Sequence, residues 1–137
     1  MKNDDLSEAH RWLSQSKRDL DDARFNADGG RYNVACFLAQ QSAEKALKAF
    51  LYSREAESVR GHSVAELCAD AADFDPAFLE IRKTAAPLDK YYIPTRYPNG
   101  LPGGIPSDAF AKEDAEHALK TSAFVIEKVE GKVPPSE

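Results

Sequence analysis

The sequence predicts an all-α protein, an up-and-down antiparallel bundle of about five helices with one long Pro/Gly loop before the last helix. Apolar residues recur at three-, four- and seven-residue spacing over most of the chain, which is the spacing of one helix face. No segment shows the sustained alternation of apolar and polar residues that is typical of a half-buried strand. Since the chain has 137 residues, we expect residues 1–137 to form a single domain.

Two long amphipathic helices are predicted first. One spans about residues 5–27 and ends at Gly29-Gly30, because glycine adopts the left-handed conformation that terminates a helix. The other spans about residues 32–54 and is the most apolar, so we expect it at the centre of the bundle. At 100° per residue its polar residues gather within an arc of roughly 140°, which Phe37 interrupts. We call these residues the polar stripe: Gln40, Gln41, Glu44, Lys45 and Lys48.

Two shorter helices follow. Ser63 and Glu66 have the spacing of a capping box, which predicts the start of a third helix. Asp75 followed by proline predicts the start of a fourth. Pro87 lies inside that fourth helix, and we expect it to kink the helix or split it in two, because proline removes one backbone hydrogen bond.

The last third of the chain contains the long loop and the last helix. Residues 93–107 hold four prolines and three glycines, which predicts a loop without regular structure. A loop of this length is more often functional or disordered than neutral. The last helix is predicted from Ser107 or Asp108 to near Gly131, and residues 132–137 are expected to form a frayed tail.

Composition and motifs disfavour several functional classes. The net charge of −5 argues against a general nucleic-acid or anionic-membrane surface. Cys36 and Cys68 lie in apolar stretches without Cys-x-x-Cys spacing, so we expect buried thiols. The three histidines are widely separated, so we expect no metal and no cofactor, although a nucleotide is possible as a ligand. The sequence has no P-loop and no nucleophile-elbow motif, which disfavours an enzymatic function. Without a visible signal peptide or a long apolar run, we expect a cytoplasmic protein with no membrane partner.

The first candidate functional residue is Arg96, the only charged residue of the long loop. It lies among Tyr91, Tyr92 and Tyr97, and prolines flank it. A guanidinium held in this way suits a bidentate contact with a phosphate or carboxylate, with a ring available for stacking. The alternative is that Arg96 pairs with a carboxylate such as Asp89 or Glu44 and holds the loop on the bundle.

The polar stripe and His62 are the other candidates. Glu44 and Lys48 form an i,i+4 pair in the favourable order, which fits a solvated helix face. The functional interpretation is that the stripe forms one wall of a polar groove that the Arg96 loop closes. His62 either caps or packs beside the third helix, or acts as a base.

With these residues in view, the chain resembles the HEPN family, the nucleotide-binding helical domain of higher eukaryotes and prokaryotes. The resemblance is carried by the run Ala-Gln-Gln-Ser-Ala-Glu-Lys-Ala-Leu-Lys at 39–48, by Gly-His-Ser at 61–63 with Leu67, and by Tyr92 with Thr-Arg-Tyr-Pro at 95–98. It implies a five-helix bundle that commonly forms homodimers and is often encoded beside a minimal nucleotidyltransferase, in a toxin-antitoxin-like two-gene module.

Many members of the family resemble metal-independent RNase toxins that use an Arg followed, after four to six residues, by a His. This sequence has no Arg and His at that spacing, and no histidine follows Arg96 in the loop. A metal-independent RNase also needs a group that moves the 2′-hydroxyl proton. The resemblance therefore favours binding of a nucleotide or RNA end over cleavage, with His62 or Tyr97 as substitutes if cleavage occurs.

Three functional hypotheses follow. The first is a dimeric HEPN-like domain that binds a nucleotide or RNA end, together with a minimal nucleotidyltransferase partner. The second is a metal-independent RNase toxin with a divergent site. The third is a purely structural interaction or dimerisation module. No catalytic residue is assigned, and the expected ligand-binding residues are Arg96, Tyr97, Tyr92, Gln41, Glu44, Lys45, Lys48 and His62.

Overall fold

The structure is a computed structural model, and it describes residues 3–136. This part of the chain is helical and contains no β-strand, which confirms the all-α prediction. Its six α-helices and two short 3-10 helices are α1 (Asn3–Asp28), α2 (Tyr32–Ser53), α3 (Val64–Ala72), α4 (Phe78–Ala85), η1 (Ala86–Tyr91), η2 (Pro98–Gly100), α5 (Pro106–Ala109) and α6 (Lys112–Glu130).

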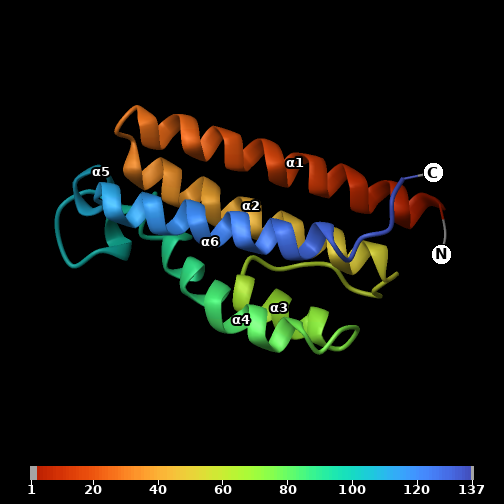
Figure 1. Ribbon diagram of the computed structural model, residues 1–137. Helices are drawn as coiled ribbons and strands as arrows, with labels where there is room; N and C mark the ends of the chain where they lie inside the picture. Colours follow the sequence, from red (N-terminus) through yellow and green to blue (C-terminus); the bar gives the residue numbers. More distant parts are fainter. Residues whose placement is uncertain (1–2, 137) are drawn as a thin grey trace.

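The long helices α1, α2 and α6 lie side by side, and the shorter α3 and α4 form a second, smaller group beneath them (Figure 1). The chain between η1 and α6, including α5, lies at one end of the bundle, and the start of α1 and the segment after α6 lie at the other. α2 packs on α1, α3 and α6, so it is the central helix that its apolar composition predicts. Gly30 follows α1 with a φ of 76°, a conformation that favours glycine.

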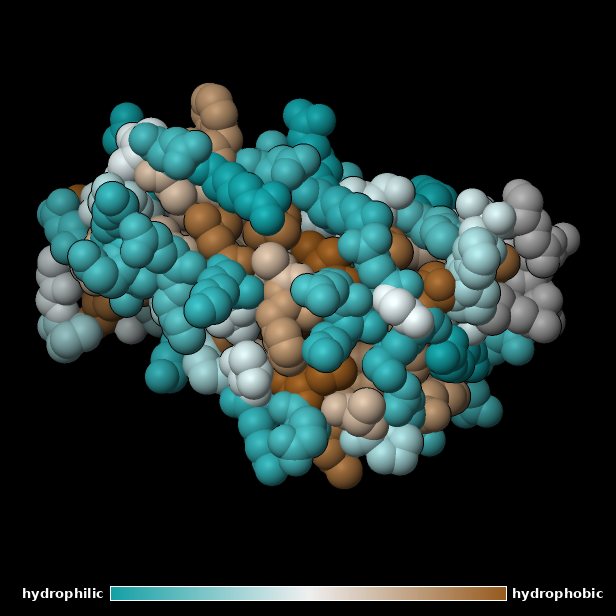
Figure 2. Space-filling model, viewed as in Figure 1, coloured by the Kyte–Doolittle hydropathy of each residue, from teal (hydrophilic) through white to brown (hydrophobic). Residues whose placement is uncertain are grey.

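Aromatic and aliphatic side chains join the two groups of helices. Phe50 of α2 and Phe78 of α4 are fully buried, and their ring centres are 4.4 Å apart. Leu47, Leu67 and Leu88 are buried in the same core. On the face shown in Figure 2, hydrophilic side chains dominate the surface, and hydrophobic ones show mainly between the helices. Burial of this apolar surface is the main force that holds the helices together.

Pro87 splits the fourth predicted helix, as expected. α4 ends at Ala85 and continues as the 3-10 helix η1, which starts at Ala86. A proline at this place has no N–H for the α-helical ladder and is accepted in the first turn of the next element. After the split, Asp89 of η1 contacts Val64 at the start of α3, and Tyr92 contacts His62 just before it.

The last predicted helix is also split, and this split was not expected. Phe110 and Ala111 are extended and separate the short α5 from α6. Phe110 packs edge-on against Tyr91 at 6.0 Å, and the Asp114 carboxylate accepts the Ala111 N–H at 2.8 Å, which begins α6 afresh. The prediction of a loop without regular structure is therefore wrong at Pro98–Gly100, where η2 forms, and at Pro106, where α5 begins.

The C-terminal tail also differs from the prediction. Lys132 donates to Asp75 at 2.6 Å, Val133 packs against the core, and the Pro134 carbonyl accepts from His10 Nε2 at 2.7 Å. Residues 132–134 are thus tied to the bundle, and Glu137 lies outside the described residues. None of the helices in residues 3–136 has the length and hydropathy needed to cross a bilayer.

Candidate functional site

A turn in the long loop positions Arg96. The N–H groups of Arg96 and Tyr97 both donate to the Ile93 carbonyl, at 3.0 and 3.1 Å. The Thr95 carbonyl accepts from Asn33 Nδ2 at 3.1 Å, which fastens the turn to the first turn of α2. Gly100 closes the loop, because a Cβ at this position would lie 3.1 Å from the Pro94 Cα. The loop is therefore folded onto the end of the bundle where α2 begins.

The Arg96 guanidinium lies among three aromatic rings. Its central carbon is 4.3 Å from the ring centre of Phe37, 4.6 Å from that of Tyr92 and 5.2 Å from that of Tyr97. Its Nε donates to the Tyr92 carbonyl at 2.9 Å. A cation over aromatic faces gains about 0.5–1 kcal/mol per contact at an exposed site. We call Arg96, Phe37, Tyr92, Tyr97 and His62 the Arg96 site.

No carboxylate within residues 3–136 forms an ion pair with Arg96. Both carboxylates that the sequence offered as partners are engaged elsewhere. Asp89 accepts from Ser63 Oγ at 2.8 Å and from the N–H groups of Val64 and Ala65 at 2.6 and 3.1 Å. It therefore caps α3 together with Ser63. Glu44 contacts His62 and Lys48. The alternative that Arg96 pairs with Asp89 or Glu44 is wrong.

His62 connects the Arg96 site to the polar stripe. Its imidazole stacks on the Tyr92 ring, with centres 5.0 Å apart and planes 15° from parallel. Its Nδ1 lies 3.2 Å from Glu44 Oε1, and its carbonyl accepts from Gln40 Nε2 at 2.8 Å. Because a carboxylate can only accept, Nδ1 carries the proton that is donated to Glu44. Nε2, the other ring nitrogen, makes no bond to Glu44. The His62 side chain is 61% exposed.

In the polar stripe, Gln40, Glu44 and Lys48 are buried, and Gln41 and Lys45 are half-buried. Glu44 is 3% exposed, and its Oε2 lies 3.3 Å from Lys48 Nζ. Gln41 donates to Gln40 at 2.8 Å and lies 3.4 Å from Glu44. Lys45 forms an ion pair with Asp19 of α1. The interpretation of the stripe as a solvated face is wrong, because α1 and the segment around His62 cover it.

The structure thus divides the eight expected ligand-binding residues into two sets. In the first set, Arg96 contacts Tyr97 and Tyr92, and Tyr92 contacts His62. Glu44 contacts His62, and Gln41 contacts Glu44. Lys45 and Lys48 face α1 instead: Lys45 contacts Asp19, and the Lys48 ammonium lies 5.5 Å from the Trp12 ring centre. The loop therefore reaches the stripe through Tyr92 and His62, and its arginine does not contact the two lysines.

Comparison with known proteins tests the resemblance to the HEPN family. The family profile of the HEPN domain matches residues 9–132, which is most of the chain. The chain belongs to the HEPN domain family. Among solved structures, TT1696 from Thermus thermophilus superposes on this HEPN domain with a TM-score of 0.80 and 38% identity, covering 91% of this chain and 98% of that one. The helical bundle that the resemblance implies is confirmed.

Two further solved structures and one curated relative are similar to this HEPN domain. ST0689, an archaeal HEPN homologue, has a TM-score of 0.77 and 36% identity, covering 98% of this chain and all of that one. An HEPN domain protein from Thermotoga maritima has a TM-score of 0.70 and 26% identity, covering 89% and 96%. Human sacsin is 28% identical over 127 residues, which are 90% of this chain, and the chain spans only 3% of the length of sacsin.

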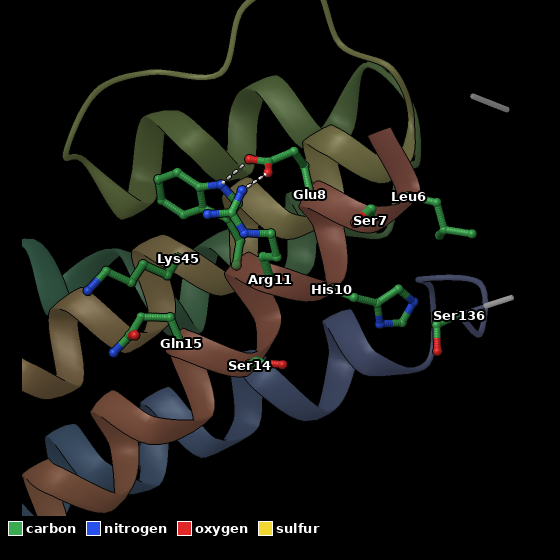
Figure 3. A pocket seen from close by; sticks show the side chains of 10 residues that line it. Leu6, Ser7, Glu8, His10, Arg11, Ser14, Gln15, Lys45 and Ser136 are labelled. Carbon is green, nitrogen blue, oxygen red and sulfur yellow. Dashed lines mark hydrogen bonds and ion pairs between the residues drawn. The ribbon is translucent and has the colours of Figure 1, made fainter. Parts of the chain in front are cut away.

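A broad, open hollow of this HEPN domain, shown in Figure 3, is lined by no residue of the Arg96 site. It surrounds the first half of α1, and Lys45 is its only member from the expected ligand-binding residues. Glu8 accepts from Trp12 Nε1 at 3.3 Å and pairs with Arg11, as the dashed lines in Figure 3 show. Lys45 and Ser136 lie on different sides of α1 in this view, so the hollow runs along the outside of this helix.

Sequence reasoning missed three residues that contact the Arg96 site, its loop or the polar stripe. Phe37 was visible only as an interruption of the polar stripe, yet its ring is the nearest aromatic contact of Arg96. Asn33 fastens the loop, and Asp19 neutralises Lys45. The position of Phe37 on the polar arc was the one usable signal, because an apolar residue on a polar face needs a partner from outside its own helix.

Proposed function

We propose that this HEPN domain binds a nucleotide or RNA end at the Arg96 site and acts without catalysing a reaction on it. The proposal rests on the environment of the Arg96 guanidinium. Three aromatic rings lie close to it, and no carboxylate within the described chain forms an ion pair with it. A guanidinium presents a planar fork of donors that matches a phosphate, and the half-exposed Tyr97 ring offers a face for a base.

Titration of the purified protein with nucleotides and short RNA by calorimetry tests the proposal. Arg96→Ala is expected to reduce the affinity by about tenfold or more, since a charge-assisted hydrogen bond is worth roughly 1.5–3 kcal/mol. Arg54→Ala is the matched control, because Arg54 lies 4.6 Å from the Phe50 ring at the other end of α2. Equal binding by the wild type and Arg96→Ala would remove Arg96 from the ligand site.

The wider role that we propose is one half of a two-gene module, with a minimal nucleotidyltransferase as the partner of an HEPN homodimer. The family membership and the aromatic surroundings of an unpaired arginine support a nucleotide-related role. Co-expression with the product of the neighbouring gene and light scattering of the purified protein test the two partnerships. If the protein is a monomer and does not co-purify with the co-expressed product of the neighbouring gene, this part of the proposal is contradicted.

A second candidate function is metal-independent RNA cleavage, and the geometry of His62 favours it. Glu44 holds the His62 proton on Nδ1, so Nε2 can accept the proton of a 2′-hydroxyl. His62 and Arg96 both contact the Tyr92 ring and therefore lie close together. The 2′-oxygen would then attack phosphorus and form a 2′,3′-cyclic phosphate, and the 5′-oxygen would leave with the proton that His62 Nε2 took up. This function predicts RNA cleavage in the presence of a chelator that both His62→Ala and Arg96→Ala abolish. Binding without cleavage leaves the first function.

A further inference from the structure

His62 is held from several directions, yet one of its ring nitrogens is free. Its Nδ1 contacts Glu44, its ring stacks on Tyr92, and its carbonyl accepts from Gln40. Its Nε2 forms no hydrogen bond within residues 3–136, and the side chain is 61% exposed. The structure therefore presents one polar ring atom to solvent in a fixed orientation, as a preorganised binding group does.

A hydroxyl group is the partner that suits this nitrogen. A neutral Nε2 only accepts and a protonated one only donates, whereas a hydroxyl does both, so the contact is possible in either protonation state of His62. A phosphate oxygen that carries no proton can bind only the protonated ring. In a ribonucleotide the hydroxyls lie on the sugar, and the 2′-hydroxyl is the one by which a protein distinguishes RNA from DNA.

The Arg96 guanidinium separates His62 from the ring that we assign to the base. Tyr92 and Tyr97 both contact the guanidinium, at 4.6 and 5.2 Å, but the two rings form no contact with each other. Tyr92 has His62 stacked on it, and Tyr97 is half-exposed. A phosphate within RNA joins two sugars. With this phosphate on Arg96, one sugar leads to a base on Tyr97, and the other lies on the side of Tyr92 and His62.

Arg60 and Lys90 add positive charge around the same groups. Both are exposed and form no ion pair within the described part of the chain, and they precede His62 and Tyr92 by two residues. Cations of this kind contact phosphates, which RNA and DNA share, so they raise the affinity for both without distinguishing them. A preference for RNA must therefore come from a group that hydrogen bonds to the sugar.

We infer that the Arg96 site selects RNA over DNA, because His62 Nε2 forms a hydrogen bond with the 2′-hydroxyl of the nucleotide on the 5′ side of the bound phosphate. This inference rests on the proposed function of the same site. That hydroxyl is the one nearest to the phosphate, since it lies on the carbon next to the esterified 3′-oxygen. The contact binds the hydroxyl and needs no proton transfer, so it is independent of RNA cleavage.

Calorimetric titration with four dinucleotides tests the selectivity. They are ApA, dApA without the 2′-hydroxyl of its 5′ nucleotide, ApdA without that of its 3′ nucleotide, and dApdA without either. ApA and ApdA are expected to bind about threefold to tenfold more tightly than dApA and dApdA, which is the range of one net hydrogen bond. Mass spectrometry of the recovered ApA verifies that the titration measures affinity and not cleavage.

Exchanges at His62 separate the hydrogen bond from the stacking. His62→Phe keeps an aromatic ring that can stack on Tyr92 and removes both nitrogens, so ApA is expected to bind as weakly as dApA. His62→Gln supplies an amide that can hydrogen bond to a hydroxyl, and it is expected to restore part of the preference. His117→Phe makes the same exchange at an exposed histidine of α6 that forms no hydrogen bond, ion pair or ring contact with the Arg96 site, and it should retain the wild-type preference.

The results distinguish a failure of this inference from a failure of the proposed function. If ApA and dApA bind equally well to the wild type, or if His62→Phe keeps the difference, the inference is wrong, and the proposed function stands as long as Arg96→Ala weakens both ligands. A preference that disappears in Tyr92→Phe or Tyr97→Phe, but not in His62→Phe, would assign the sugar contact to a tyrosine hydroxyl and overturn the inference in the same way. If no dinucleotide binds, or if Arg96→Ala binds all four like the wild type, the proposed function fails and this inference fails with it.

Discussion

At the scale of single residues, the choice of arginine at position 96 matters more than its charge. The guanidinium carbon approaches three ring centres within 5.2 Å while Nε donates to the Tyr92 carbonyl. A planar cation can stack on rings and still present its remaining N–H groups outward. A lysine at this position would carry the charge without the flat face or the paired donors, so it would keep neither the stacking nor the fork.

The two cysteines show the opposite case, residues whose environment suppresses their chemistry. Burial, with a smaller contribution from the Asp114 carboxylate, raises the pKa of Cys36 to about 12. Burial and the Asp89 carboxylate raise the pKa of Cys68 to about 12, against a weaker opposing effect of Arg82. Since the thiolate is the reactive form, both thiols are expected to resist a thiol reagent at about pH 8 in the native protein and to react after unfolding. Mass spectrometry measures this, and rapid labelling of the native protein would contradict it.

At the scale of elements, α2 has two roles that are usually separate. It packs on α1, α3 and α6 as the central helix, and it also carries a polar stripe. The two roles coexist because nearly every polar group of the stripe has a partner: Gln40 contacts the His62 carbonyl, and Glu44 contacts Lys48. Buried charges of this kind stabilise a fold weakly as a pair, yet they are costly to leave unpaired.

The Glu44–Lys48 pair provides a prediction for α2. Glu44→Ala is expected to lower the free energy of unfolding by about 3 kcal/mol, because it leaves Lys48 buried without its carboxylate. The double variant Glu44→Leu with Lys48→Met is expected to recover most of that loss. Urea denaturation measures both.

The exposed pair Glu80–Lys83, at 2.9 Å, is the matched control for this prediction. Glu80→Ala is expected to cost less than about 0.5 kcal/mol, since solvent screens an exposed pair. Equal losses for Glu44→Ala and Glu80→Ala would show that burial does not strengthen the dependence of Lys48 on Glu44.

At the scale of the whole molecule, the segment after α6 ties distant parts of the bundle together. Lys132 bonds to Asp75 in the turn between α3 and α4, and Pro134 accepts from His10 of α1. The tail thus links the second group of helices to the first at the end opposite the Arg96 site (Figure 1). The two ends of the molecule are held by different means, one by this tail and the other by the folded loop.

The tail makes stability depend on pH in acid. The Lys132 ammonium and the Ala77 N–H hold the pKa of Asp75 below its ordinary value of 3.8. Because the folded-state pKa is depressed, its stabilisation is present above that ordinary value and is lost as the pH falls through the folded-state pKa. Asp75→Asn is therefore expected to lower the melting temperature near neutral pH, with a difference from the wild type that disappears in stronger acid. Thermal melts over this pH range measure it, and a constant difference down to about pH 2 would contradict the linkage.

The helices could be predicted because their signals are local. The Gly30 stop after α1, the Ser63 cap of α3 and the break at Pro87 all follow from residues within a turn or two of the position concerned. The break at Phe110 could not be predicted in this way, because its cause is the contact with Tyr91. The docking of the tail likewise depends on His10, which lies more than a hundred residues earlier in the chain.

The sequence by itself determined the helix class, the central position of α2 and four of the five residues of the Arg96 site, all but Phe37, because periodicity, capping and composition act along the chain. Only the tertiary structure decided which charges remain free: it paired Glu44 with Lys48 and His62, placed Asp89 at the start of α3, and surrounded Arg96 with three rings. Each of these choices joins side chains from different turns or elements. The physical reason is that pairing and burial of charge depend on distances in space, which helix periodicity does not specify.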